Sequence, residues 1–297
     1  MLRACIDIGS NTTRLLVAEC EQGRISEFHQ ERAFTRIGAA IDEDGMIAAE
    51  KVAEIAAVVA AQLTAAQRLG VDAVRCVATA SVRRAANAAV LAEQIAQRCQ
   101  GLVVEVLSGE EEARLAFLGA SATSNAPAGA NLGVVDVGGG SSELVVGVRP
   151  AQISWWASYH LGSGDLTAAC LPSDPPEPPE LAAAREHIAA VLRDAEPPPV
   201  ETALAVGGSA TSLVRLAGRR LDADSLGRSL RLLCSLPAAS VAAEFGLDHQ
   251  RVRLLPAGLL ILEAAAERLR VPLRVARGGL REGVLLEAAG SAGPGVE

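Results

Sequence analysis

The chain has 297 residues, of which 50% are hydrophobic and 21% are charged, and its formal net charge is −8. This length permits two domains, and the apolar content excludes a chain that is disordered as a whole. The acidic balance argues against non-specific nucleic-acid binding, which needs a basic face. No apolar run is long enough to span a membrane, and the run after Met1 is too short for a signal peptide, so we expect a cytoplasmic protein.

Strand and helix patterns alternate through the first part of the chain. Strands are predicted at 4–8 and 15–18, joined by a polar turn into a hairpin, and they are followed by a helix at 48–69, a strand at 74–78, a helix at 85–97 and a strand at 102–107. This alternation predicts an α/β domain with a largely parallel sheet that is entered through a hairpin.

The hairpin pattern returns at 132–148, with Asp136 in the place of Asp7. Such self-similarity predicts two halves of similar fold that face one another across a cleft. The segment 120–130, rich in Ser, Pro, Gly and Ala, is the natural boundary, so we expect domains at 1–125 and 126–297. The second is expected to contain a helix at 180–193, a strand at 203–206, helices at 212–217 and 257–269, a strand at 273–276, a helix from 281 and a frayed tail at 291–297.

Three glycine-rich turns each follow an apolar strand. Because glycine lacks a Cβ, backbone amides in such turns can approach phosphate oxygens, and a helix that begins there adds its dipole. Any one of them alone is equally well explained as a tight turn. Together they predict a phosphate site whose members would converge if the halves pack as a clam: Gly9, Ser10, Asn11, Gly138, Gly139, Gly140, Ser141, Gly207, Gly208 and Ser209.

Acidic residues stand beside these turns. Asp7 and Asp136 each end a strand two residues before a glycine, where a carboxylate can hold a magnesium ion directly or through water. The dispersed cysteines and histidines form no zinc-binding pattern, so any metal is expected to use oxygen ligands.

A third acidic feature is the run of glutamates after Ser108. Ser108 and Glu111 form a capping box, and an acid in the first turn of a helix complements the helix dipole. This explains Glu110 and Glu111 structurally. Glu112 lies about 100° further round the helix and escapes that explanation. It is therefore a candidate general base.

The motifs together resemble the exopolyphosphatase and guanosine pentaphosphate phosphatase (Ppx/GppA) family, within the actin-like ATPase superfamily. The resemblance runs along nearly the whole chain. It is carried by the segments DIGSNT at 7–12, ATASVR at 78–83, SGEEEARL at 108–115, DVGGGSSE at 136–143, GGSAT at 207–211 and GGLREG at 278–283.

This resemblance implies two similar actin-like, ribonuclease-H-like domains and a phosphohydrolase that removes the terminal phosphate of polyphosphate or guanosine pentaphosphate. Glu112 matches the family's catalytic glutamate, which orients and deprotonates the attacking water. Arg83 matches a phosphate-contacting arginine, and Glu143 would join Asp7 and Asp136 around a metal ion. The resemblance implies Mg²⁺ or Mn²⁺ as cofactor, leaves a K⁺ requirement open, and makes a homodimer the expected assembly.

One position departs from the family pattern. The family commonly has an arginine where this chain has Asp165, and an acid there removes an attraction for a polyanion. The chain resembles the short family members that lack additional helical domains. Two other functions therefore stay open: a weakly active or inactive regulator that binds guanosine penta- or tetraphosphate or polyphosphate, and an actin-like small-molecule kinase.

Adjacent tryptophans offer a further feature of the second half. Trp155 and Trp156 are a candidate platform for stacking a guanine base. The alternative is that they are neighbours on one strand with one side chain buried, and this alternative is favoured.

Overall fold

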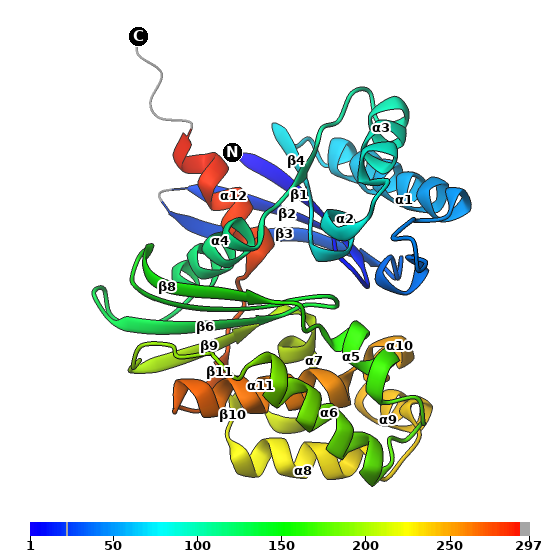
Figure 1. The fold of residues 1–297 in the computed structure, drawn as a ribbon. Coiled ribbons are helices and arrows are strands. Elements are labelled where there is room, and N and C mark those ends of the chain that lie inside the picture. The colour runs from blue at the N-terminus through cyan, green and yellow to red at the C-terminus, as the bar shows by residue number, and fades with distance from the viewer. Residues whose placement is uncertain (22, 292–297) are drawn as a thin grey trace. The chain divides into compact units, whose positions relative to one another are not determined.

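The computed structural model describes residues 1–21 and 23–291, and the chain divides into two compact units (Figure 1). Unit 1 comprises Met1–Thr123 together with the described residues from Gly278 to Ser291, and unit 2 comprises Ser124–Arg277. These units differ from the predicted domain ranges at the C-terminal end, because the helix after Gly278 packs within unit 1. Among the described residues, no helix is both long and apolar enough to cross a bilayer.

Unit 1 is built on a five-stranded sheet with helices on both faces. Its strands are β1 (Leu2–Ile8), β2 (Thr13–Glu21), β3 (Arg24–Ala33), β4 (Ala73–Ala78) and β5 (Val104–Val106). Its helices are η1 (Gly38–Ala40), α1 (Ala49–Arg68), α2 (Ala80–Arg84), α3 (Ala88–Arg98), α4 (Gly109–Ala122) and α12 (Leu280–Ser291).

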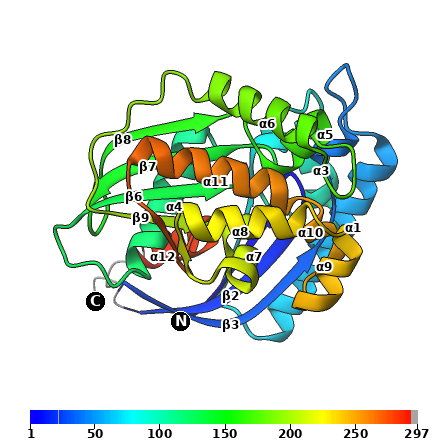
Figure 2. The same ribbon diagram turned by 90° about the horizontal axis from the view of Figure 1, so that it is seen from below.

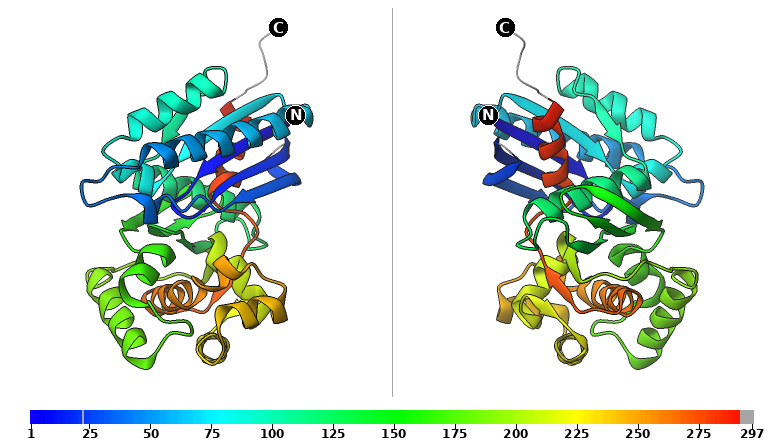
Figure 3. Two further views of the ribbon diagram at one scale, coloured as in Figure 1. Left: turned by 90° about the vertical axis from the view of Figure 1, so that its right-hand side faces the viewer. Right: turned by 90° about the vertical axis from the view of Figure 1, so that its left-hand side faces the viewer.

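Alternating residues of β1 supply the cores on the two faces of this sheet. Ile6 packs with Ile55 of α1 and Ile95 of α3 on one face. Cys5 packs with Leu115 of α4 and Val284 of α12 on the other face. Because successive side chains of a strand point to opposite faces, one apolar run in β1 serves both cores. Figure 3 shows α12 lying along the strands at the start of the chain.

Unit 2 is built on a six-stranded sheet. Its strands are β6 (Asn131–Val137), β7 (Ser142–Val148), β8 (Gln152–Tyr159), β9 (Thr202–Val206), β10 (Arg220–Leu221) and β11 (Leu273–Val275). Its helices are α5 (Ser163–Cys170), α6 (Pro178–Val191), α7 (Gly207–Ala217), α8 (Ala223–Leu233), α9 (Ala238–Phe245), α10 (His249–Val252) and α11 (Leu255–Leu269). Figure 2 shows α11 crossing the strands, and its buried residues share one core with those strands.

The two sheets have the same topology. Their strand orders are β3-β2-β1-β4-β5 in unit 1 and β8-β7-β6-β9-β11 in unit 2, where β10 adds one further strand at the edge. In each unit the first strand pairs antiparallel with the second and parallel with the fourth in chain order. The prediction of two similar α/β domains is therefore confirmed.

Some element boundaries differ from the prediction. The predicted helix at 212–217 begins five residues earlier, at Gly207, so the third glycine-rich turn is itself the first turn of α7. The predicted helix at 85–97 is α3, and the short α2 precedes it. Only Ser291 of the predicted tail lies within the described residues, as the last residue of α12.

The chain leaves and re-enters unit 1 at neighbouring points. The backbone N–H of Gly278 donates a hydrogen bond of 3.0 Å to the hydroxyl of Thr123. Beyond this bond α12 packs closely on α4: a Cβ added at Gly119 would lie 2.0 Å from the carbonyl oxygen of Gly279. The two helix backbones are therefore in direct contact.

Candidate active site

The predicted catalytic residues of unit 1 follow neighbouring parallel strands. β1 pairs with β4, and β4 pairs with β5, so the carboxyl ends of the three strands meet at one edge of the sheet. The backbone N–H of Thr79 donates to the carbonyl of Ile8 at 3.2 Å, and that of Leu107 donates to Ala78 at 2.9 Å. These bonds continue the ladder one residue beyond the strands. In open α/β sheets, ligands bind at this edge.

Arg83 and Glu112 are brought together at this edge. The Arg83 Nη1 atom lies 2.5 Å from Glu112 Oε2 and 2.5 Å from the carbonyl oxygen of Leu107. Only 7% of the Glu112 side chain is exposed, against 29% for Arg83. A buried carboxylate needs a compensating charge, and the guanidinium supplies it. The pair fixes the candidate base beside the residue expected to contact phosphate.

The helix that carries Glu112 begins at the predicted Ser108 cap, but only half of the predicted capping box is present, because the Glu111 side chain pairs with Arg114. The backbone N–H of Glu111 donates to Ser108 Oγ at 3.1 Å, which caps α4. Glu110 is exposed and Glu111 is partly exposed, whereas Glu112 is buried. The three successive glutamates therefore differ in the way that helix geometry predicts, and the side chain of Glu112 alone is directed inward.

Asp7 is the second-last residue of β1 and has an unusual electrostatic environment. Burial raises the pKa of its carboxyl group, while the positive charges of Arg281 and Arg14 oppose that rise. Its Oδ1 atom is buried and has no hydrogen-bond partner within residues 1–21 and 23–291. The turn that follows is tight, with the Gly9 N–H donating to the carbonyl of Thr12 at 3.0 Å. Ser10 is buried, so its side chain is not displayed on the surface.

In unit 2 the second glycine turn is held by the start of α5. The backbone N–H and the hydroxyl of Ser163 both donate to the carbonyl of Gly138, at 2.9 and 3.1 Å. The N–H groups of Gly164 and Asp165 donate to the carbonyl of Gly139 at 2.9 and 3.1 Å. The first amides of α5 are thus occupied by the turn, which they hold in one conformation. They are not free to bind an anion.

The third glycine turn, at the start of α7, packs against the end of β6. Gly207 has a φ of +84°, and a Cβ there would lie 2.4 Å from Asp136 Oδ1. A larger residue is excluded both by backbone conformation and by space. The first amides of α7 therefore lie beside Asp136. Ser209, in contrast, is 1% exposed, so its hydroxyl is not displayed on the surface.

Asp136 and Glu143 are the carboxylates predicted to hold a metal in unit 2. They are direct partners in the β6–β7 ladder, so their side chains share one face of the sheet. Glu143 is buried and its Oε1 accepts a hydrogen bond of 2.9 Å from the Ser158 hydroxyl. Magnesium is commonly held by one or two carboxylates together with water and substrate phosphates, and this pair fits that pattern.

The complete predicted metal set is not found as a cluster. Among the described residues, no group of three His, Cys, Asp or Glu side chains is arranged to hold a metal ion. Asp7 stands in unit 1, where its direct partner in the β1–β2 ladder is Arg14. Its surroundings are therefore cationic, unlike those of Asp136. A metal bound by all three acids stays a prediction.

Arg251 was not predicted from the sequence and lies beside the third turn. Arg251 is only 5% exposed, and a Cβ added at Gly208 would lie 2.8 Å from two nitrogens of its guanidinium group. The guanidinium therefore faces the first turn of α7, where an anion would bind. Nothing in the local sequence marks this residue, because α10 has only four residues and no periodic pattern.

Asp165, the departure from the family pattern, lies next to the second turn. Its Oδ2 is 3.2 Å from His160 Nε2, and 31% of its side chain is exposed. The acid therefore adds negative charge near Gly139, where the resemblance implies a positive one.

The two tryptophans do not form a common platform. Both lie on β8, where adjacent side chains point to opposite faces. Trp155 packs against the core of unit 2, whereas Trp156 is 40% exposed. The interpretation of a strand with one buried side is confirmed.

A cavity of about 260 Å³ opens between α6 and α11 of unit 2. It is lined by apolar residues and by the ion pair of Arg185 and Glu263, and it contains none of the predicted site residues. The candidate chemistry lies instead at the carboxyl ends of the parallel strands.

The chain is similar to known proteins along nearly its whole length. A family model described as the Ppx/GppA phosphatase family matches residues 16–292. Exopolyphosphatase 2 of Mycobacterium tuberculosis is 29% identical over 316 residues, which cover 97% of this chain and 98% of that protein. A guanosine-5'-triphosphate,3'-diphosphate pyrophosphatase of Aeromonas hydrophila is 29% identical over 308 residues, covering 98% of this chain and 60% of that protein. The crystal structure of the Aquifex aeolicus Ppx/GppA family member superimposes with a TM-score of 0.82 at 28% identity, covering 99% of both chains.

Proposed function

Because the chain belongs to the Ppx/GppA phosphatase family, we propose that it hydrolyses the terminal phosphoanhydride bond of inorganic polyphosphate or guanosine pentaphosphate. The observation that carries this proposal is the ion pair of the buried Glu112 with the partly exposed Arg83, at the carboxyl ends of parallel strands. Relatives named exopolyphosphatase and guanosine-5'-triphosphate,3'-diphosphate pyrophosphatase support the substrate class.

In the proposed reaction Glu112 accepts a proton from the attacking water. The water oxygen forms a bond to the terminal phosphorus, and the bond from that phosphorus to the bridging oxygen breaks. The products are orthophosphate and a chain shortened by one phosphate. Arg83 moves its Nη1 atom from Glu112 to the phosphate oxygens. A planar guanidinium is well suited to bind these oxygens. Release of the carboxylate from Arg83 at that moment makes Glu112 more basic as the water arrives.

Binding of the phosphate chain is assigned to the glycine turns. The first amides of α7 and the guanidinium of Arg251 offer positive potential beside Gly208. Asp136 and Glu143 would hold a Mg²⁺ or Mn²⁺ ion, which would neutralise phosphate charge. In phosphoryl transfer, preorganised positive charge is a main source of transition-state stabilisation. No covalent enzyme intermediate is needed.

Asp165 supports a second candidate, a regulator that binds these anions with little turnover. Its carboxylate stands beside the second glycine turn, in the place of an arginine that would attract phosphate. Loss of one positive charge from a phosphate site weakens binding of the transition state as well as binding of the substrate. Replacement Asp165→Arg is therefore expected to raise phosphate release.

The decisive experiment measures phosphate release from polyphosphates of defined length and from guanosine pentaphosphate. Glu112→Gln should lower kcat by roughly 100-fold or more, because the amide cannot accept the proton. The exposed neighbour Glu110, changed to Gln, is the matched control and should retain kcat. Equal activity of Glu112→Gln and wild type would refute the proposed base. Tight binding of the same anions by wild type without phosphate release would favour the regulator.

A further inference from the structure

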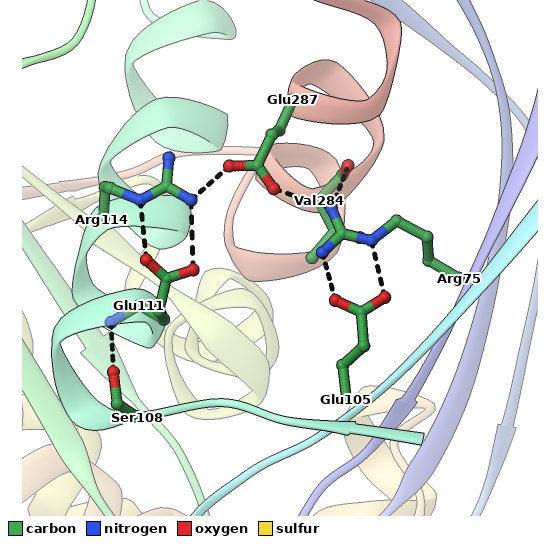
Figure 4. Close-up of polar contacts among 7 residues, drawn as sticks. All are labelled: Arg75, Glu105, Ser108, Glu111, Arg114, Val284 and Glu287. Carbon is green, nitrogen blue, oxygen red and sulfur yellow. Dashed lines mark hydrogen bonds and ion pairs between the residues drawn. The ribbon is translucent and has the colours of Figure 1, made fainter. Parts of the chain in front are cut away.

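Five charged side chains of alternating sign connect the sheet of unit 1 to helices α12 and α4, and we call them the charge chain (Figure 4). In order they are Glu105 of β5, Arg75 of β4, Glu287 of α12, Arg114 of α4 and Glu111 of α4. The last of them stands next to the candidate base in the sequence. None of the five has a role in the chemistry described above.

Glu287 is the central link. Its Oε2 accepts from Arg75 Nη1 at 2.7 Å, while its Oε1 accepts from Arg114 Nη2. Figure 4 shows the carboxylate between the two guanidinium groups. One carboxylate therefore joins a strand of the sheet to α4. Removing its charge breaks both connections at once.

The outer links are paired forks. Arg75 donates to both oxygens of Glu105, at 3.0 and 2.5 Å. Arg114 donates to both oxygens of Glu111, each at 3.2 Å. Two parallel hydrogen bonds restrict the orientation of both partners more than a single ion pair does. The first turn of α4 is thus connected to the sheet through side chains of fixed orientation.

The electrostatics of Glu287 agree with this role. Burial acts to raise the pKa of its carboxyl group, but hydrogen bonds from Arg75 and Arg114 bring the pKa below its ordinary value. The side chain is 27% exposed, so the pair is screened less than a surface salt bridge. The carboxylate is ionised at neutral pH and holds both arginines.

Backbone packing fixes α4 only further along the helix. The direct contact of Gly119 with Gly279 lies ten residues beyond Gly109, the first residue of α4. A second contact, between Gly283 and the backbone of Leu115, lies nearer the start. The first turn, which carries Glu112, is N-terminal to both. There the Glu111 side chain is connected to α12 through Arg114 of the same helix, and Glu112 pairs with Arg83.

We propose that Glu287 is a positioning residue that holds the first turn of α4, and with it the Glu112 carboxylate, in register with Arg83. The inference rests on the proposed function of Glu112 as the base. It assigns to α12 a part in catalysis without contact with substrate. Since Glu112 meets Arg83 at 2.5 Å, a shift of this turn by a fraction of that distance changes where the proton acceptor lies.

The test compares Glu287→Gln with wild type by hydrogen exchange and by kinetics. Backbone amides in 109–114 should exchange about 3- to 10-fold faster in the variant, whereas amides of unit 2 should not change. For phosphate release, kcat should fall by about 3- to 10-fold with KM within twofold, because substrate-binding groups are unaffected. Glu287→Asp, which retains the charge, should lie between the two in both measurements.

Glu263→Gln is the matched control, because Glu263 also pairs with an arginine and is 20% exposed, but it lies in unit 2 on α11. It should change neither the exchange of 109–114 nor kcat. Unchanged exchange in Glu287→Gln would overturn the inference, and so would faster exchange with an unchanged kcat. A wild-type protein that releases no phosphate from any of these substrates would instead overturn the proposed function and, with it, the catalytic part of the inference.

Discussion

Asp136 and Glu143 are direct cross-strand partners in unit 2. At the matching register of unit 1 the partners are Asp7 and Arg14. Like charges directly opposite each other are unfavourable, and a bound divalent cation would offset their repulsion, whereas Asp7 already has a cationic partner. The two units share one topology, but the residue opposite the aspartate is positively charged in unit 1 (Arg14) and negatively charged in unit 2 (Glu143). The difference favours unit 2 over unit 1 as the place of the proposed cation.

Glu143→Gln is expected to weaken metal binding. Loss of one carboxylate should raise the Mn²⁺ dissociation constant by about 10-fold or more. The constant is measured by titration calorimetry or by electron paramagnetic resonance of Mn²⁺. Glu201→Gln, an exposed acid of the same unit, should bind as wild type does. If Glu143→Gln and wild type bound Mn²⁺ equally, the site would have to lie elsewhere.

Gly207→Ala is expected to destabilise the protein by about 1–3 kcal/mol. Residue 207 has a positive φ, which is unfavourable for any residue with a Cβ, and the added Cβ would lie 2.4 Å from Asp136 Oδ1. Gly227→Ala in α8 is the control, since its Cβ meets only the flexible end of Arg231 at 3.6 Å. That change should be neutral or stabilise by up to about 1 kcal/mol, as alanine favours helix. Urea unfolding of both variants measures the contrast, and equal effects would contradict it.

Asp7 should make stability depend on pH. Burial raises the pKa of its carboxyl group in the folded state, so the folded protein binds more protons than the unfolded chain in the window above the ordinary value of 3.8. Stability therefore falls as pH rises from that value through the raised one. Asp7→Asn should remove this dependence and raise Tm more at pH 7 than at pH 4.

The exposed Asp44 provides the comparison for Asp7. Asp44→Asn should leave the pH profile of Tm as in wild type. A profile of Asp7→Asn that runs parallel to wild type from pH 4 to pH 7 would show that this carboxyl group is not the source of the dependence.

Arg251→Lys should raise KM for the phosphate substrate. An ammonium group cannot reproduce the planar fork that faces Gly208, so we expect roughly a 10-fold increase with a smaller change in kcat. Arg228→Lys, on α8, is the control and should retain KM. Because Arg251 is buried, thermal unfolding of the variant is measured alongside, and an unchanged KM in a folded variant would exclude the contact.

Much of the fold follows from local patterns in the sequence. The apolar runs that became β1, β4, β6 and β9 are bounded by glycine turns, and the helices α1 and α11 have long apolar periodicity. The return of one hairpin pattern at Asp136 predicted the repeat. By contrast, β3 has a mostly exposed, polar sequence, and it is a strand because β2 offers it a partner.

The candidate site was only partly predictable. The helix position of Glu112 distinguished it from Glu110, and its pairing with Arg83 follows from parallel strands ending at one edge. Arg251 was missed because its role comes from contact with Gly208, 43 positions away in the sequence. Such contacts are set by tertiary packing and leave no local signal.

The chain returns to unit 1 at Gly278, which is hydrogen-bonded to Thr123, and this return has a consequence for biosynthesis. Unit 2 is one uninterrupted stretch of chain, so it can complete its core while translation is still under way. Unit 1 cannot, because Val284 and Leu285 form part of a core with Cys5 and Leu16. Unit 1, whose sheet is made first, is therefore completed last, and until α12 has been made, α4 covers that face of the sheet without it.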